Sequence, residues 1–277
     1  MQLTALNKLT ATPVTASSYT ETGLPLSKTR YYKVTAVNAG GESPGSSEVT
    51  TRTAPACTNI GGSIQGNTLV LSTTVTTLAG IVGAPGAING PSTVAQFSYP
   101  TGVATDGTYL YVADTGTTGI PGNTIRRIVI STGAVSTVAG SGAAALTNGP
   151  GTAAAFNGPK GITTYGTNLY VADTGNSAIR KIDSTGNVTT VVTGLSSPQG
   201  ITTDGAKLYF ADTANHTVRT IAFTGGTITT LAGTSGTAGS ANGTGSAALF
   251  NLPAGITTDG TNLYIVDTSN QTIRKIQ

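Results

Sequence analysis

The stretch Gly255–Thr268 reads Gly-Ile-Thr-Thr-Asp-Gly-Thr-Asn-Leu-Tyr-Ile-Val-Asp-Thr, and three earlier stretches of the chain repeat it closely. The earlier copies begin at Gly102, Gly161 and Gly200, so the repeat recurs at intervals of several tens of residues. A repeat of this length is one supersecondary unit that buries its apolar faces only against its neighbours. The sequence therefore predicts a repeat architecture.

Each unit contains four strand-like pieces. The first is Gly-Ile-Thr-Thr, which ends at Asp-Gly or an equivalent turn, and the second is Leu-Tyr-Val-Ala-Asp or a close variant. The third is typified by Thr272–Ile276 and the fourth by residues 135–140, with counterparts at 188–194 and 228–233. Four short strands joined by tight turns form an antiparallel meander, which is one blade of a β-propeller.

Several short motifs recur with the strands: Pro-x-Gly-Ile, Leu-Tyr-Val-Ala-Asp-Thr, an Asn before the third strand, Ile-Arg-Lys-Ile and Thr-Leu-Ala-Gly. These motifs resemble NHL repeats, whose family forms β-propellers that commonly have six blades. The resemblance covers residues 72–277, with units beginning near 100, 159, 198 and 253. We therefore expect an all-β fold, a β-propeller built from four NHL-like blade units.

The two ends of the propeller segment are complementary. A lone fourth strand, Val75–Gly80, precedes the first unit, and the last unit stops after its third strand at Gln277. Pairing of Val75–Leu78 with Thr272–Ile276 would close a ring and remove an exposed strand edge. The alternative is an incomplete or truncated array.

Residues 1–54 differ from the repeats. Strands are expected at Tyr31–Val37 and Ser47–Thr51 from their alternating pattern. The sequence from Ser18 to Pro44 resembles the C-terminal half of a fibronectin type III domain, which implies a partial β-sandwich. Residues 55–71 are expected to be a linker and lead-in.

Composition limits the possible partners. Only 9% of residues are charged, the net charge is +3, and no run of Lys or Arg occurs, so we expect no nucleic-acid partner. No stretch approaches the roughly 20 apolar residues of a membrane span, so we expect no membrane insertion. The Gly-, Thr- and Ser-rich composition is typical of secreted bacterial surface proteins. From this composition we expect an extracellular or cell-envelope location. No signal peptide opens the chain, so we expect it to be part of a longer exported protein.

The meander places the turns between second and third strands on the same face as the connections between blades. Three of these connections are long (81–99, 141–158 and 234–252), and 194–198 is short. Acidic residues precede the turns and can accept their backbone N–H groups, and asparagines within the turns tolerate positive φ. The sequence thus predicts structural turn caps at Asp114, Asp173, Asp212, Asp267, Asn176, Asn215 and Asn270. A ring of these carboxylates binding calcium is the alternative.

Each long connection ends in a phenylalanine, and these are Phe97, Phe156 and Phe250. We expect them to anchor the connections between blades. The alternative is a platform on which a ligand stacks.

No catalytic constellation is apparent. The single histidine, His216, cannot supply a zinc site, and the only glutamates, Glu21, Glu42 and Glu48, lie outside the propeller. We therefore expect a non-enzymatic binding or scaffold module without a cofactor, which binds protein or polysaccharide through its long-loop face. The alternatives are a calcium-dependent lactonase-like hydrolase, which related propellers suggest, and a purely structural spacer.

Overall fold

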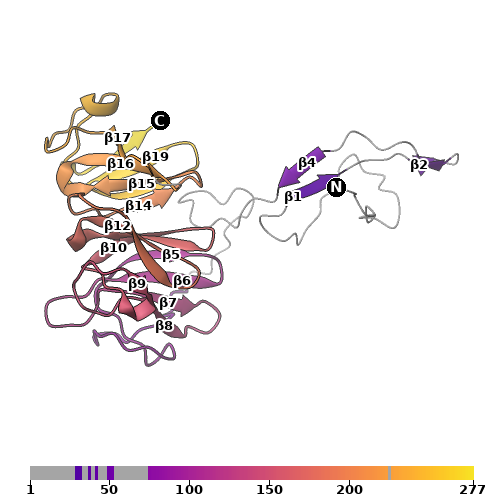
Figure 1. The fold of residues 1–277 in the computed structure, drawn as a ribbon, viewed down its shortest axis with the longest axis vertical. Coiled ribbons are helices and arrows are strands. Elements are labelled where there is room, and N and C mark those ends of the chain that lie inside the picture. The colour runs from indigo at the N-terminus through magenta and orange to yellow at the C-terminus, as the bar shows by residue number, and fades with distance from the viewer. Residues whose placement is uncertain (1–28, 33–36, 39–40, 43–48, 53–73, 224–225) are drawn as a thin grey trace. The chain divides into compact units, whose positions relative to one another are not determined.

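In a computed structural model of the chain, the described residues are 29–32, 37–38, 41–42, 49–52, 74–223 and 226–277 (Figure 1). The chain divides into two compact units, Met1–Ala56 and Cys57–Gln277. In the first unit, β1 (Thr29–Tyr32) pairs with β4 (Val49–Arg52), and β2 (Val37–Asn38) pairs with β3 (Gly41–Glu42).

These short strands overlap the strands predicted at Tyr31–Val37 and Ser47–Thr51. The remainder of the predicted fibronectin type III segment and the 55–71 linker lie outside the described residues, so both stay predictions.

The second unit contains four antiparallel sheets in chain order, which we call blades 1 to 4. Blade 1 is formed by β5 (Pro100–Thr105), β6 (Tyr109–Asp114), β7 (Thr124–Val129) and β8 (Val135–Ala139). Blade 2 is formed by β10 (Pro159–Tyr165), β11 (Asn168–Asp173), β12 (Ala178–Ile182) and β13 (Asn187–Val192), with β9 (Gly149–Pro150) added at its edge. Blade 3 is formed by β14 (Ile201–Thr203), β15 (Lys207–Asp212), β16 (Thr217–Ala222) and β17 (Thr229–Ala232). Blade 4 is formed by β18 (Pro253–Thr258), β19 (Leu263–Asp267) and β20 (Thr272–Ile276).

The prediction of an all-β fold with four propeller-like blades is confirmed. Helix in the described residues is limited to single 3₁₀ turns, and none of these residues forms a helix long and apolar enough to cross a membrane. Two 3₁₀ turns precede Phe156 and Phe250: η1 (Gly151–Ala153) and η4 (Gly245–Ala247). Three more follow the second strands of blades 2 to 4: η2 (Thr174–Asn176), η3 (Thr213–Asn215) and η5 (Thr268–Asn270).

The first strands of successive blades lie side by side: β5 beside β10, β10 beside β14, and β14 beside β18. Glycine makes this approach possible. A Cβ at Gly102 would collide with the carbonyl of Lys160, and a Cβ at Gly161 would collide with that of Gln199. Gly200 also donates its N–H to the carbonyl of Ala254 at 2.8 Å. The glycines that open the first three repeats, Gly102, Gly161 and Gly200, therefore set the spacing between blades.

The blades pack face to face through apolar side chains. Between blades 1 and 2, Ile125 and Ala113 meet Ile162 and Val171. Equivalent clusters join blade 2 to blade 3 and blade 3 to blade 4. Each blade thus buries its apolar faces against its neighbours, as the repeat predicts.

The ends of the array do not pair. Among the described residues β20 bonds only to β19, and residues 74–78 form no strand. Gly90 instead exchanges backbone hydrogen bonds with Val135 of β8, while Ala79, Ala95 and Phe97 pack against Val112 of blade 1. This segment directly precedes blade 1 in the chain, and it packs on the apolar face of that blade. Val75–Leu78 thus do not pair with Thr272–Ile276, and of the two alternatives the described residues form the open array.

Candidate functional site

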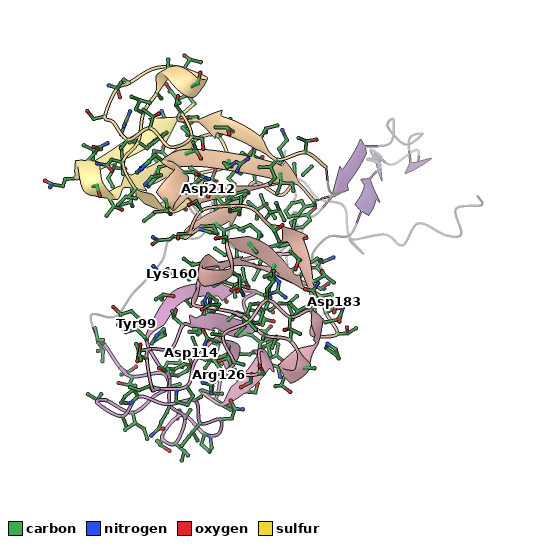
Figure 2. All side chains as sticks on the ribbon, turned by 60° about the vertical axis from the view of Figure 1, so that its left-hand side comes forward. Tyr99, Asp114, Arg126, Lys160, Asp183 and Asp212 are labelled. Atoms are coloured by element: carbon green, nitrogen blue, oxygen red, sulfur yellow. The ribbon has the colours of Figure 1, made fainter. Side chains whose placement is uncertain are left out.

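An ion pair with a buried aspartate recurs in every blade, and in blades 1 and 2 its arginine is fully buried as well. The aspartate that ends the second strand is fully buried, and its Oδ2 accepts a hydrogen bond from Nη1 of an arginine in the third strand. The N–O distances in blades 1 to 4 are 2.9, 2.8, 3.0 and 2.9 Å for Asp114–Arg126, Asp173–Arg180, Asp212–Arg219 and Asp267–Arg274. Figure 2 shows the first pair, with Asp114 and Arg126 close together inside the blade array.

The other oxygen of each aspartate binds the connection that enters the blade. Oδ1 of Asp173 accepts the N–H of Asn157 at 2.7 Å, and the same bond is made to Ser98, Ser196 and Asn251 in the other blades. The prediction that these aspartates cap the N–H groups of the following turn was wrong. The turn N–H groups have other partners, because Gly175 donates its N–H to the carbonyl of Asn157 at 2.8 Å and Ser177 donates to Thr174 at 3.2 Å. No side-chain cap bond forms, and the carboxylate binds the incoming chain instead.

The asparagines of these turns also act through their side chains. Asn176, Asn215 and Asn270 each donate Nδ2 to Oδ2 of the aspartate three residues earlier, at 2.8 Å. The expected positive φ falls one residue later, on Ser177, His216 and Gln271. The backbone strain is thus carried by the residue that leads into the third strand, while the asparagine satisfies the buried carboxylate.

The arginines hold the long connections in place. In blade 2, Arg180 donates Nη1 to the carbonyl of Ala155 at 3.0 Å, and Nη2 to the carbonyl of Thr147 and to Oδ1 of Asn148, both at 2.8 Å. Asn89 and Asn242 occupy the same place in blades 1 and 4. Sequence reasoning missed these three asparagines, although each lies eight residues before the phenylalanine of its connection.

The phenylalanines of the long connections lie against the arginines of the ion pairs. Phe156 and Phe250 are buried, and the guanidinium groups of Arg180 and Arg274 lie 5.1 Å from their ring centroids. Phe97 is half-buried under Arg126, at 5.2 Å. Blade 3 has the short connection and no such phenylalanine, and among the described residues Arg219 bonds only to Asp212 and is 21% exposed. Burial leaves the faces of Phe156 and Phe250 inaccessible for a stacked ligand.

These clusters therefore organise the fold. Both oxygens of each aspartate are engaged by protein donors, and the four carboxylates lie in four separate blades. Within the described part of the chain, no three His, Cys, Asp or Glu side chains converge as a metal site. His216 accepts the N–H of Leu252 through Nδ1 at 3.0 Å, so it serves the connection between blades 3 and 4.

The long-loop face exposes apolar side chains. Seven large apolar residues are exposed on the long connections, namely Ile81, Val82, Ile88, Val94, Tyr99, Leu146 and Leu252. Tyr99 and Leu252 directly precede the first strands, are 68% and 39% exposed, and have φ values of 55° and 51°. This left-handed conformation is uncommon for residues other than glycine. A shallow hollow of about 300 Å³ on this side is lined by Ala87, Pro121 and Gly142 among others.

The opposite face carries the Asp-Gly turns and a larger groove of about 460 Å³ between blades 1 and 2. Figure 2 shows Tyr99 and Asp183 on opposite sides of the blade array. On this face a tyrosine of the second strand donates its hydroxyl to the turn aspartate in three blades, at 2.9 Å for Tyr111–Asp106, 2.8 Å for Tyr209–Asp204 and 2.9 Å for Tyr264–Asp259.

In blade 3 this bond shifts the pKa of both of its partners. Burial and the bond to Asp204 raise the pKa of Tyr209 to about 12. Burial alone would raise the pKa of Asp204, but hydrogen bonds from the backbone of Lys207 and Ala206 and from Tyr209 outweigh it and lower that pKa. The turn carboxylate therefore stays ionised.

No protein-family model matches the chain, and no curated protein sequence matches it significantly. Among solved structures, an auxiliary nutrient binding protein from Bacteroides thetaiotaomicron aligns at 18% identity and a TM-score of 0.49, covering 67% of this chain and 49% of that chain. The chain thus spans about half of that protein's length. A catalytically inactive virginiamycin B lyase from Staphylococcus aureus, solved with quinupristin, aligns at 23% identity and a TM-score of 0.43, covering 64% and 55%. A chain of a nidogen/laminin complex aligns at 18% identity and a TM-score of 0.43, covering 65% and 76%.

Proposed function

We propose that the chain is a non-enzymatic binding module of an extracellular or cell-envelope protein, and that its long-loop face binds protein or polysaccharide. The residue before the first proline of each repeat is left-handed in all four blades, as Tyr99, Gly158, Ser197 and Leu252. The observation that carries this proposal is that exposed apolar residues, Tyr99 and Leu252, occupy this position in two of the blades. Strained backbone persists only where the surroundings impose it, and such residues concentrate at functional sites.

The connections that present these residues are rigidly held. Each long connection is fixed by the buried arginine, by an asparagine side chain and by the aspartate of its blade. A contact surface that is ordered before binding loses less conformational entropy when a partner arrives. The arrangement of exposed apolar groups on a rigid frame is thus suited to recognition.

The test replaces both side chains with glycine. Gly158 occupies the same position naturally in blade 2, with φ of 56°, so Tyr99→Gly and Leu252→Gly remove the side chains and relieve the backbone. Binding of the double variant to immobilised peptidoglycan, capsular polysaccharide and purified envelope proteins is compared by biolayer interferometry with Ile130→Ser. Ile130 is an exposed apolar residue that follows β7 on the opposite face.

We expect the double variant to lose at least about tenfold in affinity, because each buried apolar side chain contributes about 1.5–3 kcal/mol. Ile130→Ser should bind as the parent does. Equal binding by all three proteins, or binding of none of the probes, would contradict the placement. Lactone hydrolysis that a chelator abolishes would instead support the calcium-dependent hydrolase.

A further inference from the structure

The groove on the Asp-Gly face runs between the second strand of blade 1 and the turns of blade 2. Blade 1 contributes Tyr109, Tyr111 and Arg127, and blade 2 contributes Asn168 and Asp183 among others. Its volume of about 460 Å³ is within the range of small-ligand sites, which is about 300–1,000 Å³.

Arg127 is the unusual member of this groove. Its guanidinium carbon lies 4.7 Å from the ring centroid of Tyr109. Its Nε is buried without a partner, as is that of Arg126, Arg180 and Arg219, so its terminal nitrogens make the difference. It forms no hydrogen bond or ion pair to any residue that the structure describes. By contrast, Arg180 donates both of its terminal nitrogens to protein acceptors, and Arg126 and Arg274 do the same. A half-buried guanidinium with unused donors is suited to an external acceptor.

Asp183 supplies acceptors beside these donors. Its Oδ1 accepts three bonds, from the N–H groups of Thr185 and Asn187 and from the Thr185 hydroxyl, and these bonds lower its pKa. Its Oδ2 accepts none from the described residues. The groove therefore offers free donors and a free charged acceptor next to two tyrosine rings.

The equivalent groove between blades 2 and 3 is filled by the protein itself. Phe223 stacks on Tyr165 with ring centroids 4.0 Å apart and an interplanar angle of 6°, and it also contacts Tyr170 at 5.2 Å. In the first groove the corresponding positions are Ser184 in place of Phe223 and Asp106 in place of Tyr165. An aromatic ring therefore fills the groove between blades 2 and 3, whereas the groove between blades 1 and 2 is open and has polar residues in its lining.

We propose that the groove between blades 1 and 2 is a second binding site, which takes a neutral oligosaccharide. A sugar presents an apolar C–H face, which suits the tyrosine rings, and vicinal hydroxyls, which accept from Arg127 and donate to Asp183. The two carboxylates of Asp106 and Asp183 outnumber the single guanidinium of Arg127, so the site disfavours an anionic ligand. This site is separate from the long-loop face, and it stands or fails independently of that proposal.

The experiment fills the groove between blades 1 and 2 with an aromatic side chain, as Phe223 fills the groove between blades 2 and 3. Isothermal titration calorimetry is run with cellotetraose, mannotetraose and xylotetraose, and with trigalacturonate as the anionic counterpart. The variants are Ser184→Phe, which places an aromatic residue where Phe223 lies in blade 3, and Arg127→Met. Lys275→Met is the matched control, because Lys275 occupies the position of Arg127 in blade 4.

We expect at least one neutral tetrasaccharide to bind, and both groove variants to weaken it at least about tenfold, the loss for one charge-assisted hydrogen bond. Lys275→Met and the double glycine variant of the long-loop face should bind it as the parent does. Absence of binding by all neutral tetrasaccharides, preference for trigalacturonate, or unchanged binding by a folded Ser184→Phe protein would each overturn the proposal.

Discussion

At the scale of single residues, the buried Asp–Arg pair is the most consequential feature. An ion pair that is removed from water is costly to break on one side only, because the remaining charge is left without compensation. The terminal nitrogens of Arg180 make four hydrogen bonds, one to Asp173 and three to acceptors of the connection. Arg219 bonds only to Asp212 among the described residues. The two arginines offer a comparison within one protein.

We predict that Arg180→Met lowers the free energy of unfolding by about 3–5 kcal/mol, the usual cost of breaking a buried pair. Arg219→Met should cost less, about 1.5–3 kcal/mol, because Arg219 is 21% exposed and holds no long connection. Urea denaturation followed by far-UV circular dichroism measures both. Equal losses would mean that the bonds from Arg180 to its connection contribute nothing.

The sequence predicted these aspartates as structural turn caps and allowed pairing with the arginines only as a surface contact, whereas the pairs in blades 1 and 2 are buried. Each third strand carries one of these arginines, namely Arg126, Arg180, Arg219 and Arg274. The alternation of residues along a strand does not show that such a charged side chain points between two blades. Burial of the pair depends on the long connection covering it, and that contact joins residues some 25 positions apart, such as Arg180 and Ala155. Distant contacts of this kind leave no local periodicity in a sequence.

At the scale of elements, the glycines that open the repeats position the first strands. Gly161 has no room for a Cβ because the backbone of Gln199 in blade 3 lies against it. Gly255 is the same residue of the repeat in blade 4, and a Cβ there would meet only Val266 of its own blade, at 3.1 Å. The meander itself was predictable because period-two alternation and turn residues are local signals.

We predict that Gly161→Ala destabilises the protein by about 1–3 kcal/mol, since the backbone of two blades must separate. Gly255→Ala should cost less than about 1 kcal/mol, because only the side chain of Val266 must adjust. Thermal and urea unfolding of the two variants measure the difference. Similar losses of unfolding free energy in both variants would show that the glycines matter for strand propensity and not for the close approach of the blades.

At the scale of the whole array, the four blades leave one apolar face uncovered within the part that the structure describes. Ile125, Ile179 and Val218 occupy one position of the third strand and are fully buried, whereas Ile273 at that position in blade 4 is 69% exposed. The sequence left ring closure and an open array as alternatives, because complementary strand fragments at two ends show that pairing is possible but not that the ends meet. The described residues have the open arrangement. The segment before blade 1 packs on blade 1 instead.

This exposed face yields the last prediction. Replacing an exposed apolar residue changes stability by about 0.5 kcal/mol or less, whereas burying a charge is strongly destabilising. Ile273→Lys should therefore keep the unfolding midpoint of the parent, and Ile179→Lys, at the equivalent position of blade 2, should prevent folding. Large exposed apolar patches also promote association, so Ile273→Lys should reduce concentration-dependent self-association in analytical ultracentrifugation. If Ile273→Lys were as damaging as Ile179→Lys, another part of the chain would have to cover blade 4, and the open array would be only the arrangement of the described residues.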